Sequence, residues 1–281
     1  MKPTRKEVHH INKSTKYVLC IGITLLTSIL MVSGYKAMTI LHQYKVDRAK
    51  YDTLSQAYAK PSLNEVPEIT ESNNDPRQGS NEYREALNER SPINVDFQLI
   101  RDEVNPETMG WIYCDDTPIN YPVMYHQADN IYYLNHNSNG EDTACGAIYI
   151  DCSNFPDFRD TNTIIHGHHL NDGSMFGSLG RWSDQEYFDS HKVFYLNTHD
   201  SDYKVVMFAY FETPVGSSVY QIDFSGQEEI SQWVKWLQNE SLIKSDYEYM
   251  TGDHFIVLST CMYSFENARG VLCGYVIPLK Q

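Results

Sequence analysis

An uncharged run near the N-terminus constrains this chain more than any other feature. Residues 17–35 (YVLCIGITLLTSILMVSGY) carry no charged side chain, and Lys16 and Lys36 stand on either side. At a rise of about 1.5 Å per residue, a helix of this length just spans the hydrocarbon core of a bilayer. A cleaved signal peptide is the alternative, but the run is longer than a usual apolar signal region and no clear Ala-x-Ala site follows. We therefore expect an uncleaved signal-anchor over residues 17–36.

The charge distribution predicts an orientation and excludes one class of partner. Residues 1–36 hold six basic residues and one acidic residue, a net charge of +5, whereas the remainder holds 16 basic and 36 acidic residues, a net charge of −20. Basic tails stay on the cytoplasmic side, so we expect residues 1–16 inside the cell and the main body outside. An acidic body lacks the basic face that phosphate backbones need, so nucleic acid is not an expected partner.

The segment after the anchor divides into a helix, a stalk and a folded domain. Large residues recur at helical spacing over 41–59, namely Leu41, Tyr44, Tyr51, Leu54 and Tyr58. This spacing predicts a continuing helix. Residues 60–81 are polar, contain three prolines and show no apolar period, which is typical of a flexible stalk. We assign residues 37–92 to the juxtamembrane helix and stalk, and residues 93–281 to the folded domain.

The rest of the chain is dominated by short runs rich in β-branched and aromatic residues. They are INYPVMY (119–125), GAIYID (146–151), NTIIHG (162–167), KVFYLN (192–197), YKVVMFAYF (203–211), HFIVLSTC (254–261) and VLCGYVIPL (271–279). Gly, Asn, Asp and Pro separate these runs, a pattern typical of an antiparallel sheet or barrel. A short helix is expected over 96–104, and an amphipathic helix over 226–240, where apolar residues fall on one helical face. The predicted fold is a mostly β barrel with added helices.

The run IVLSTC delivers Cys261 at the end of a strongly apolar strand, and Arg269 follows eight residues later. Two adjacent antiparallel strands would bring both side chains to the same rim. A nearby cation favours the nucleophilic thiolate over the thiol, and an arginine can also stabilise the oxyanion of acyl transfer. An inert buried cysteine is the alternative interpretation of this segment.

Three histidines, His166, His168 and His169, follow another apolar strand and open a loop rich in Gly, Asn and Asp. A strand end is a good platform for a catalytic base. Because His166 and His168 point the same way on a strand, a metal-dependent hydrolase built on these two is an alternative. Its further ligands would be Asp172, His191 and His199. The spacing matches neither H-x-H-x-D-H nor H-E-x-x-H.

Two other residue classes carry weaker signals. The acidic set comprises Asp115, Asp116, Glu141, Asp142 and Asp151. Paired carboxylates can perform glycosidase chemistry, but this spacing is unspecific and turn positions suit most of the set. The six cysteines contain no C-x-x-C pair, which argues against a zinc ribbon or a thioredoxin-like site. A cysteine combined with a histidine elsewhere in an extracytoplasmic enzyme is typical of cysteine acyl transfer.

Four segments, in this order, resemble the sortases and class B in particular. They are GWIYCDDTPINYPVMY with DNIYYLNH, then GAIYID, then NTIIHGHHLNDGSMFGSL, then STCMYSFENARGVLCGYVI. The resemblance covers most of residues 107–279. It implies a sortase-type closed β-barrel with N-terminal helices and a helix before the catalytic cysteine strand, which is where residues 226–240 fall.

The resemblance also implies roles for individual residues. The nucleophile, directly after Thr, is Cys261; the catalytic histidine, directly after Gly, is His168; and the arginine at the start of the last strand is Arg269. The implied substrate-binding residues are Asn130, Leu134, Ser259 and Thr260. A groove wall is expected near residues 217–220.

Sortases cleave a C-terminal sorting motif after Thr, of the Asn-Pro-x-Thr kind in many class B members, through a thioester. The resemblance therefore implies secreted proteins with a C-terminal sorting signal as partners, and a peptidoglycan amine or a pilin lysine as acceptor. No metal and no cofactor are expected. The enzyme would act at the surface of a Gram-positive cell, held by one membrane-spanning helix. A non-catalytic, surface-anchored binding module is a third hypothesis.

Two features depart from the family pattern. The common Tyr-Gly-His-Asn is His-Gly-His-His here, so His166 and His169 flank the expected base. Cys273 lies close in sequence to the expected site, and a Cys261–Cys273 disulfide would abolish activity. Under reducing conditions this disulfide need not form.

Overall fold

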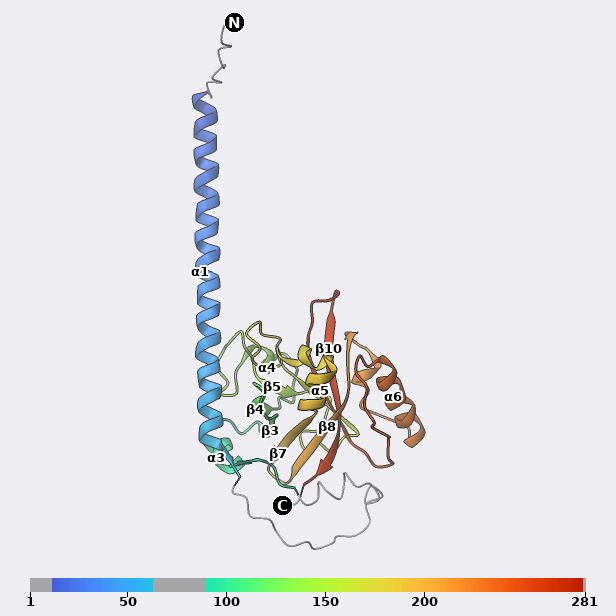
Figure 1. Ribbon diagram of the computed structural model, residues 1–281. Helices are drawn as coiled ribbons and strands as arrows, with labels where there is room; N and C mark the ends of the chain where they lie inside the picture. Colours follow the sequence, from blue (N-terminus) through green and yellow to red (C-terminus); the bar gives the residue numbers. More distant parts are fainter. Residues whose placement is uncertain (1–11, 63–88, 280–281) are drawn as a thin grey trace. The chain divides into compact units, whose positions relative to one another are not determined.

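The computed structural model describes residues 12–62 and 89–279, and the chain divides into two compact units, Met1–Val46 and Asp47–Gln281. Helix α1 (Lys13–Tyr58) spans 46 residues and passes from the first unit into the second (Figure 1). By length and composition it can cross a membrane, with a mean hydropathy of 2.0 in its most apolar window, none of which is buried. A signal sequence would pass the same test. Most of the basic tail and of the expected stalk lies outside the described residues.

The second unit is built on a closed barrel of eight strands within the described ranges. The strands are β3 (Thr108–Tyr113), β4 (Asn120–Met124), β5 (Ile148–Ile150), β6 (Asn162–His166), β7 (Val193–Thr198), β8 (Asp202–Pro214), β9 (Phe255–Cys261) and β10 (Ala268–Pro278). Their order around the barrel is β10-β8-β7-β3-β4-β5-β6-β9. The pairs β4–β5 and β6–β9 are parallel, and the other pairs are antiparallel. The predicted mostly β barrel is confirmed.

The seven predicted runs all form strands, with two differences of detail. Strand β10 begins at Ala268, before the expected run 271–279, so Arg269 lies inside the strand. Strand β3 was not among the predicted strands, because Gly110 interrupts its apolar pattern. A Cβ at this position would be crowded, because it would lie 3.0 Å from the Phe158 ring and 3.2 Å from the Asn197 carbonyl.

Helices, a two-stranded sheet and short 3-10 turns accompany the barrel strands. They are β1 (Ala59–Pro61) paired with β2 (Ile93–Val95), α3 (Phe97–Glu103), α4 (Tyr132–Asn135), α5 (Gln185–His191), α6 (Gln227–Glu240), and 3-10 turns η2 (Leu179–Ser183) and η3 (Ser218–Tyr220). Helix α3 starts at Asp96, whose carboxylate accepts a hydrogen bond from the Leu99 N–H. Both helices that the sequence predicts in this region, α3 and α6, are confirmed.

Helix α6 covers the outer face of the barrel beside β8 (Figure 1). Its buried residues are Ile230, Trp233, Val234 and Leu237, and they join a cluster that includes Phe211, Phe255, Val257, Val271 and Cys273. Full burial of one such side chain is worth about 1.5–3 kcal/mol. This packing buries residues of both β9 and β10 under α6.

The compact unit begins earlier than the boundary at residue 93 that the sequence indicates. Asp47, Tyr51 and Leu54 are 0%, 3% and 9% exposed. These residues lie four and three positions apart, so they share one face of α1. The last turns of α1 therefore pack as part of the barrel unit rather than forming a linker.

Candidate active site

The ends of β9 and β10 place Cys261 and Arg269 side by side. Strand β10 runs antiparallel to β9, and the register sets Arg269 directly opposite Cys261. The predicted juxtaposition is confirmed. Directly opposed residues have Cβ atoms about 4.5–5.5 Å apart, so the guanidinium and the sulfur share one rim of the barrel. Both residues are half-buried, and Arg269 Nη1 donates a hydrogen bond to the Ala268 carbonyl at 3.0 Å.

The histidine segment is tied to the other side of β9. Strand β6 runs parallel to β9 and sets His166 beside Ser259. Beyond the last paired residue, Gly167 N–H donates to the Ser259 carbonyl at 3.1 Å, and the Thr260 hydroxyl donates to the Gly167 carbonyl at 2.8 Å. The two segments therefore continue side by side past the end of β6.

His168 follows two residues after His166, beyond the last pair of β6 with β9, just as Cys261 follows two residues after Ser259. Side chains two residues apart on an extended segment point to the same face, so His168 shares the outer face with His166. Cys261 and Arg269 thus face one another at the ends of β9 and β10, and His168 follows Gly167 in the segment that continues from β6 beside β9.

His168 is held by contacts on several sides. Its Nε2 donates a hydrogen bond to the Leu134 carbonyl at 2.7 Å, and its own carbonyl accepts from the Phe176 N–H at 3.0 Å. Gly146 lies against the ring: a Cβ there would stand 2.9 Å from His168 Cδ2. Because a carbonyl only accepts, Nε2 carries a proton, and Nδ1 is the nitrogen that can exchange one.

His166 belongs to a different interaction. Its Nε2 pairs with Asp151 Oδ2 at 2.9 Å, and Asn130 Nδ2 donates to the same oxygen at 2.8 Å. Burial alone would raise the pKa of the Asp151 carboxyl, but the hydrogen bond and charge of His166 and the Ser153 N–H outweigh burial and lower it to about 2. The imidazole of His166 is therefore committed to a carboxylate.

The further ligands of the metal-site alternative have other partners: Asp172 accepts from the Ser174 hydroxyl, His191 bonds to the Tyr187 carbonyl and His199 pairs with Asp200. The His169 ring lies edge-on to Tyr263, with centroids 5.4 Å apart. Among the residues that the structure describes, no three His, Cys, Asp or Glu side chains form a group that could hold a metal ion. His166 and His168, the pair on which the alternative hydrolase was built, bond to Asp151 and to the Leu134 carbonyl instead.

The four residues implied in substrate binding differ in how they are placed. Ser259 is on the face of Cys261, but it is 1% exposed and its hydroxyl bonds to the Tyr220 hydroxyl at 2.9 Å. Thr260 is 2% exposed and points to the opposite face, because side chains alternate along a strand. The side chain of Thr260 joins β9 to the histidine segment.

Asn130 and Leu134 form hydrogen bonds with neighbouring residues in the described structure. The Asn130 amide donates to Asp151 and accepts from the Cys152 N–H at 2.7 Å. Leu134 is half-buried, and its carbonyl orients His168. Both residues thus border the site through the side chains that they hold in place.

Two tyrosines complete the site and were not singled out from the sequence. Tyr149 stands opposite His166 on β5, and the Tyr220 ring stacks on His166 with centroids 6.3 Å apart. Burial raises the pKa of both phenols; the charge of Cys261 raises each further and that of Arg269 lowers each. The predicted groove wall near residues 217–220 contains Tyr220, but no sequence pattern marks this residue, because it sits on a three-residue 3-10 turn.

The structure separates Cys273 from the site. Cys273 is paired with Val257 in the β9–β10 ladder, four residues from Cys261 along β9, which is about 13 Å. A disulfide needs Cα atoms within about 7 Å. Cys273 is fully buried under α6, and all six cysteines are free thiols. A Cys261–Cys273 disulfide would require β9 and β10 to separate.

Comparison with known proteins agrees with this geometry. No protein-family model matches the chain. A sortase B from Listeria monocytogenes is 32% identical over 186 residues, which cover 63% of this chain and 75% of that relative. The chain belongs to the sortase B family. Sortase B from Staphylococcus aureus is 26% identical over 267 residues, 94% of this chain and 99% of that one.

Comparison of the fold with solved structures also identifies sortase B. A crystal structure of sortase B from Bacillus anthracis matches with a TM-score of 0.67 at 30% identity, covering 85% of this chain and 100% of that chain. The class B resemblance seen in the sequence is confirmed, and the protein is a cysteine transpeptidase of the sortase type. Membership of the sortase B family argues against the two alternative hypotheses, a metal-dependent hydrolase and a non-catalytic binding module.

Proposed function

We propose that Cys261, His168 and Arg269 carry the transpeptidation reaction. The observation that supports this most is the β9–β10 register, which sets Arg269 directly opposite Cys261. The histidine segment that continues from β6 beside β9 adds to this support. A cation beside the sulfur favours the thiolate, which is the nucleophilic form. The other two histidines are engaged by Asp151 and Tyr263, which favours His168 as the proton carrier.

The first half of the reaction forms a thioester. The Cys261 thiolate attacks the carbonyl carbon of the substrate threonine, and the Arg269 guanidinium stabilises the developing oxyanion. His168, as imidazolium, gives a proton to the departing amine when the C–N bond breaks. The acyl group then remains on the sulfur.

The second half transfers the acyl group to an incoming amine. His168, now a neutral imidazole, accepts a proton from this amine as it attacks the thioester. The C–S bond breaks and the thiolate of Cys261 is restored. The same nitrogen thus serves as acid and then as base, and the hydrogen bond from Nε2 to the Leu134 carbonyl keeps the ring orientation through both halves.

We propose secreted proteins with a C-terminal Asn-Pro-x-Thr-like motif as substrates and a peptidoglycan amine as the acceptor. The class B resemblance of the segments around Asn130 and Leu134 supports the motif. Residues 17–36 would anchor the enzyme, with the N-terminus inside the cell and the catalytic domain outside. The apolar window of α1, none of which is buried, supports the anchor. Ser259 and Tyr220 would border the bound peptide, since their hydrogen bond lies beside Cys261.

The test is cleavage of an Asn-Pro-x-Thr peptide by the full-length enzyme, with products identified by mass spectrometry. Cys261→Ala should abolish cleavage, and retained activity would contradict the proposed nucleophile. Arg269→Lys should lower kcat roughly 100-fold, because an ammonium cannot reproduce the planar donors of an oxyanion site. Arg159→Lys is the matched control, since Arg159 is exposed and stacks on Phe155.

The acceptor is tested in the same assay. Peptidoglycan stem peptides and a lysine-containing pilin peptide are supplied together as amines, and the transfer products are separated by mass. A dominant stem-peptide product supports wall attachment. A dominant pilin-lysine product would replace it with pilus assembly.

A further inference from the structure

The last turns of α1 bury polar groups, which a simple linker has no reason to do. Asp47 and Tyr51 lie on the same face of the helix and are buried within the barrel unit. A buried carboxylate or phenol is costly unless it is hydrogen-bonded. The partners of these two side chains therefore show what this part of α1 holds in place.

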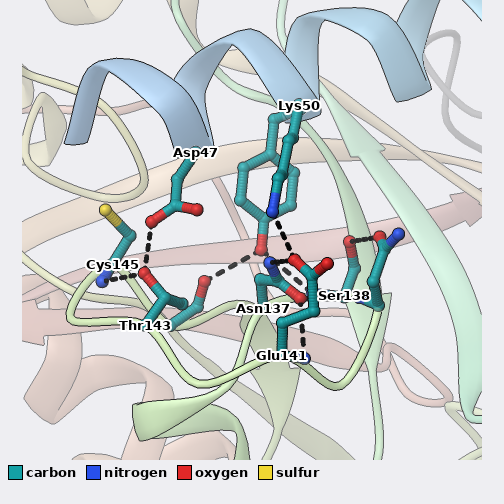
Figure 2. A network of polar contacts seen from close by, with 10 residues as sticks. Asp47, Lys50, Asn137, Ser138, Glu141, Thr143 and Cys145 are labelled. Atoms are coloured by element: carbon teal, nitrogen blue, oxygen red, sulfur yellow. Dashed lines mark hydrogen bonds and ion pairs between the residues drawn. The ribbon is translucent and has the colours of Figure 1, made fainter. Parts of the chain in front are cut away.

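Those partners lie in residues 137–146, the connection between α4 and β5, here termed the 137–146 loop. Thr143 donates its hydroxyl hydrogen bond to the Asp47 carboxylate, and Lys50 forms an ion pair with Glu141 (Figure 2). Burial together with the Asp47 carboxylate raises the pKa of the Cys145 thiol to about 12, so the thiol remains protonated. Figure 2 shows Asp47 and Lys50 reaching from α1 to this loop.

Tyr51 closes the loop at both ends with one hydroxyl group. The hydroxyl donates to the Gly146 carbonyl at 2.8 Å and accepts from the Ser138 N–H at 3.2 Å. Its ring meets Tyr121 edge-on, with centroids 5.5 Å apart, and the Tyr121 hydroxyl accepts from the Met175 N–H at 3.1 Å. Tyr51 therefore supports the 137–146 loop directly and the chain after the histidine segment through Tyr121.

The other side of the 137–146 loop contacts His168. Gly146, which accepts the hydrogen bond from Tyr51, is so close to the His168 ring that a Cβ would approach Cδ2 to 2.9 Å. The next residue, Ala147, donates its N–H to the Tyr133 carbonyl at 2.8 Å, one residue before the carbonyl that receives His168 Nε2. Thus a single residue, Gly146, stands between the Tyr51 hydroxyl and the His168 ring.

We propose that Tyr51, assisted by Asp47, is a positioning residue for His168: it holds Gly146 against the imidazole and so keeps the ring beside Cys261. The proposal rests on the role proposed above for His168. Loss of the Tyr51 hydroxyl leaves the Gly146 carbonyl and the Ser138 N–H without this partner in a buried place, so the loop has reason to move. The Lys50–Glu141 pair is partly exposed and contributes little.

The test compares Tyr51→Phe with Tyr58→Phe in the full-length enzyme. Both tyrosines are on α1, and both substitutions remove one hydroxyl; Tyr58 bonds to Glu103 at 2.9 Å, away from the loop. Tyr51→Phe should lower kcat by roughly threefold to tenfold with KM within about twofold, less than the roughly 100-fold that a 1 Å misplacement can cost. Tyr58→Phe should leave both constants unchanged.

A second readout does not depend on activity. The ring signals of His168 are followed by NMR in histidine-labelled protein and identified by their loss in His168→Gln. Tyr51→Phe should shift these signals and Tyr58→Phe should not. If Tyr51→Phe lowers only the melting temperature, and kcat and the His168 signals stay as in Tyr58→Phe, the positioning role is refuted. If His168→Gln stays fully active, the proposed catalytic role fails, and the NMR shift still decides whether Tyr51 positions the ring.

Discussion

Gly146 offers the most direct test of the site geometry, because its missing side chain is what lets His168 sit where it does. Its φ is +60°, a conformation that costs an L-residue about 1–2 kcal/mol. In Gly146→Ala the new Cβ would lie 2.7 Å from the Tyr133 carbonyl oxygen and 2.8 Å from that of Leu134. Backbone atoms cannot turn aside as side chains do, so overpacking adds about 1–3 kcal/mol. The total expected loss in unfolding free energy is about 2–5 kcal/mol.

Gly173 supplies a matched control on the far side of the histidine segment. Its φ is +81°, and a Cβ there would meet nothing within 4 Å. Gly173→Ala therefore carries the backbone cost alone, about 1–2 kcal/mol. The difference in unfolding free energy between the two variants measures the cost of the steric clash at residue 146. Urea denaturation of both variants gives this difference.

Activity separates these variants more sharply than stability does. The Cβ of Gly146→Ala would also stand 2.9 Å from His168 Cδ2, so the ring has to shift. A shift near 1 Å lowers kcat roughly 100-fold, whereas Gly173→Ala should keep kcat within about twofold. Peptide cleavage well below the melting temperature of each variant is the assay. If Gly146→Ala loses stability as expected and yet cleaves at the wild-type rate, the contact with His168 has no catalytic consequence and the reasoning is refuted.

Two further predictions concern groups around the site. The Asp151 carboxyl has a pKa of about 2 in the folded protein, below its ordinary value of 3.8. Between these two values the native state binds fewer protons than the unfolded state. The stabilisation is therefore fully present above pH 3.8 and is lost as the pH falls toward 2. Asp151→Asn should therefore lower the unfolding free energy by about 2 kcal/mol at neutral pH. The variant's unfolding free energy should also change less with pH between about pH 4 and 2, as measured by urea denaturation. If the unfolding free energies of the wild type and the variant change equally with pH in this range, the prediction is contradicted. Burial raises the pKa of the Cys273 thiol, so a thiol reagent on the native protein should modify Cys261 and leave Cys273 unmodified until denaturant is added, as peptide mapping would show; early labelling of Cys273 would contradict its burial.

The sequence predicted those parts of the site that depend on local pattern. A seven-residue strand that ends on Cys261 and a short connection to the next strand are enough to place Arg269 opposite the cysteine. The spacing of His166 and His168 also predicts a common face for these two side chains. The same alternation distinguishes Thr260 from Ser259, and it explains why Thr260 does not share a surface with its neighbours.

The remaining parts depend on contacts between segments far apart in the chain. Tyr51 bonds to Ser138 and Gly146, which are 87 and 95 residues away. Helical periodicity marks Tyr51 as part of a helix face, but it does not say what that face meets. Asp151 likewise looked like one acidic residue among several until its pairing with His166 was visible.

A row of polar residues beside the proposed catalytic residues indicates how the enzyme selects its peptide substrate. In that row His166 is committed to Asp151, and Ser259 to Tyr220, at 2.9 Å each. A peptide that displaces the Tyr220–Ser259 contact breaks a hydrogen bond between the half-buried Tyr220 and the buried Ser259. Such a peptide gains little binding free energy unless its own polar groups form hydrogen bonds with these two residues. Sites with committed polar groups reject apolar analogues far better than apolar pockets reject one extra methylene. An amide side chain, such as the asparagine of the proposed motif, can donate and accept at once, so it suits this row better than an aliphatic side chain of similar size.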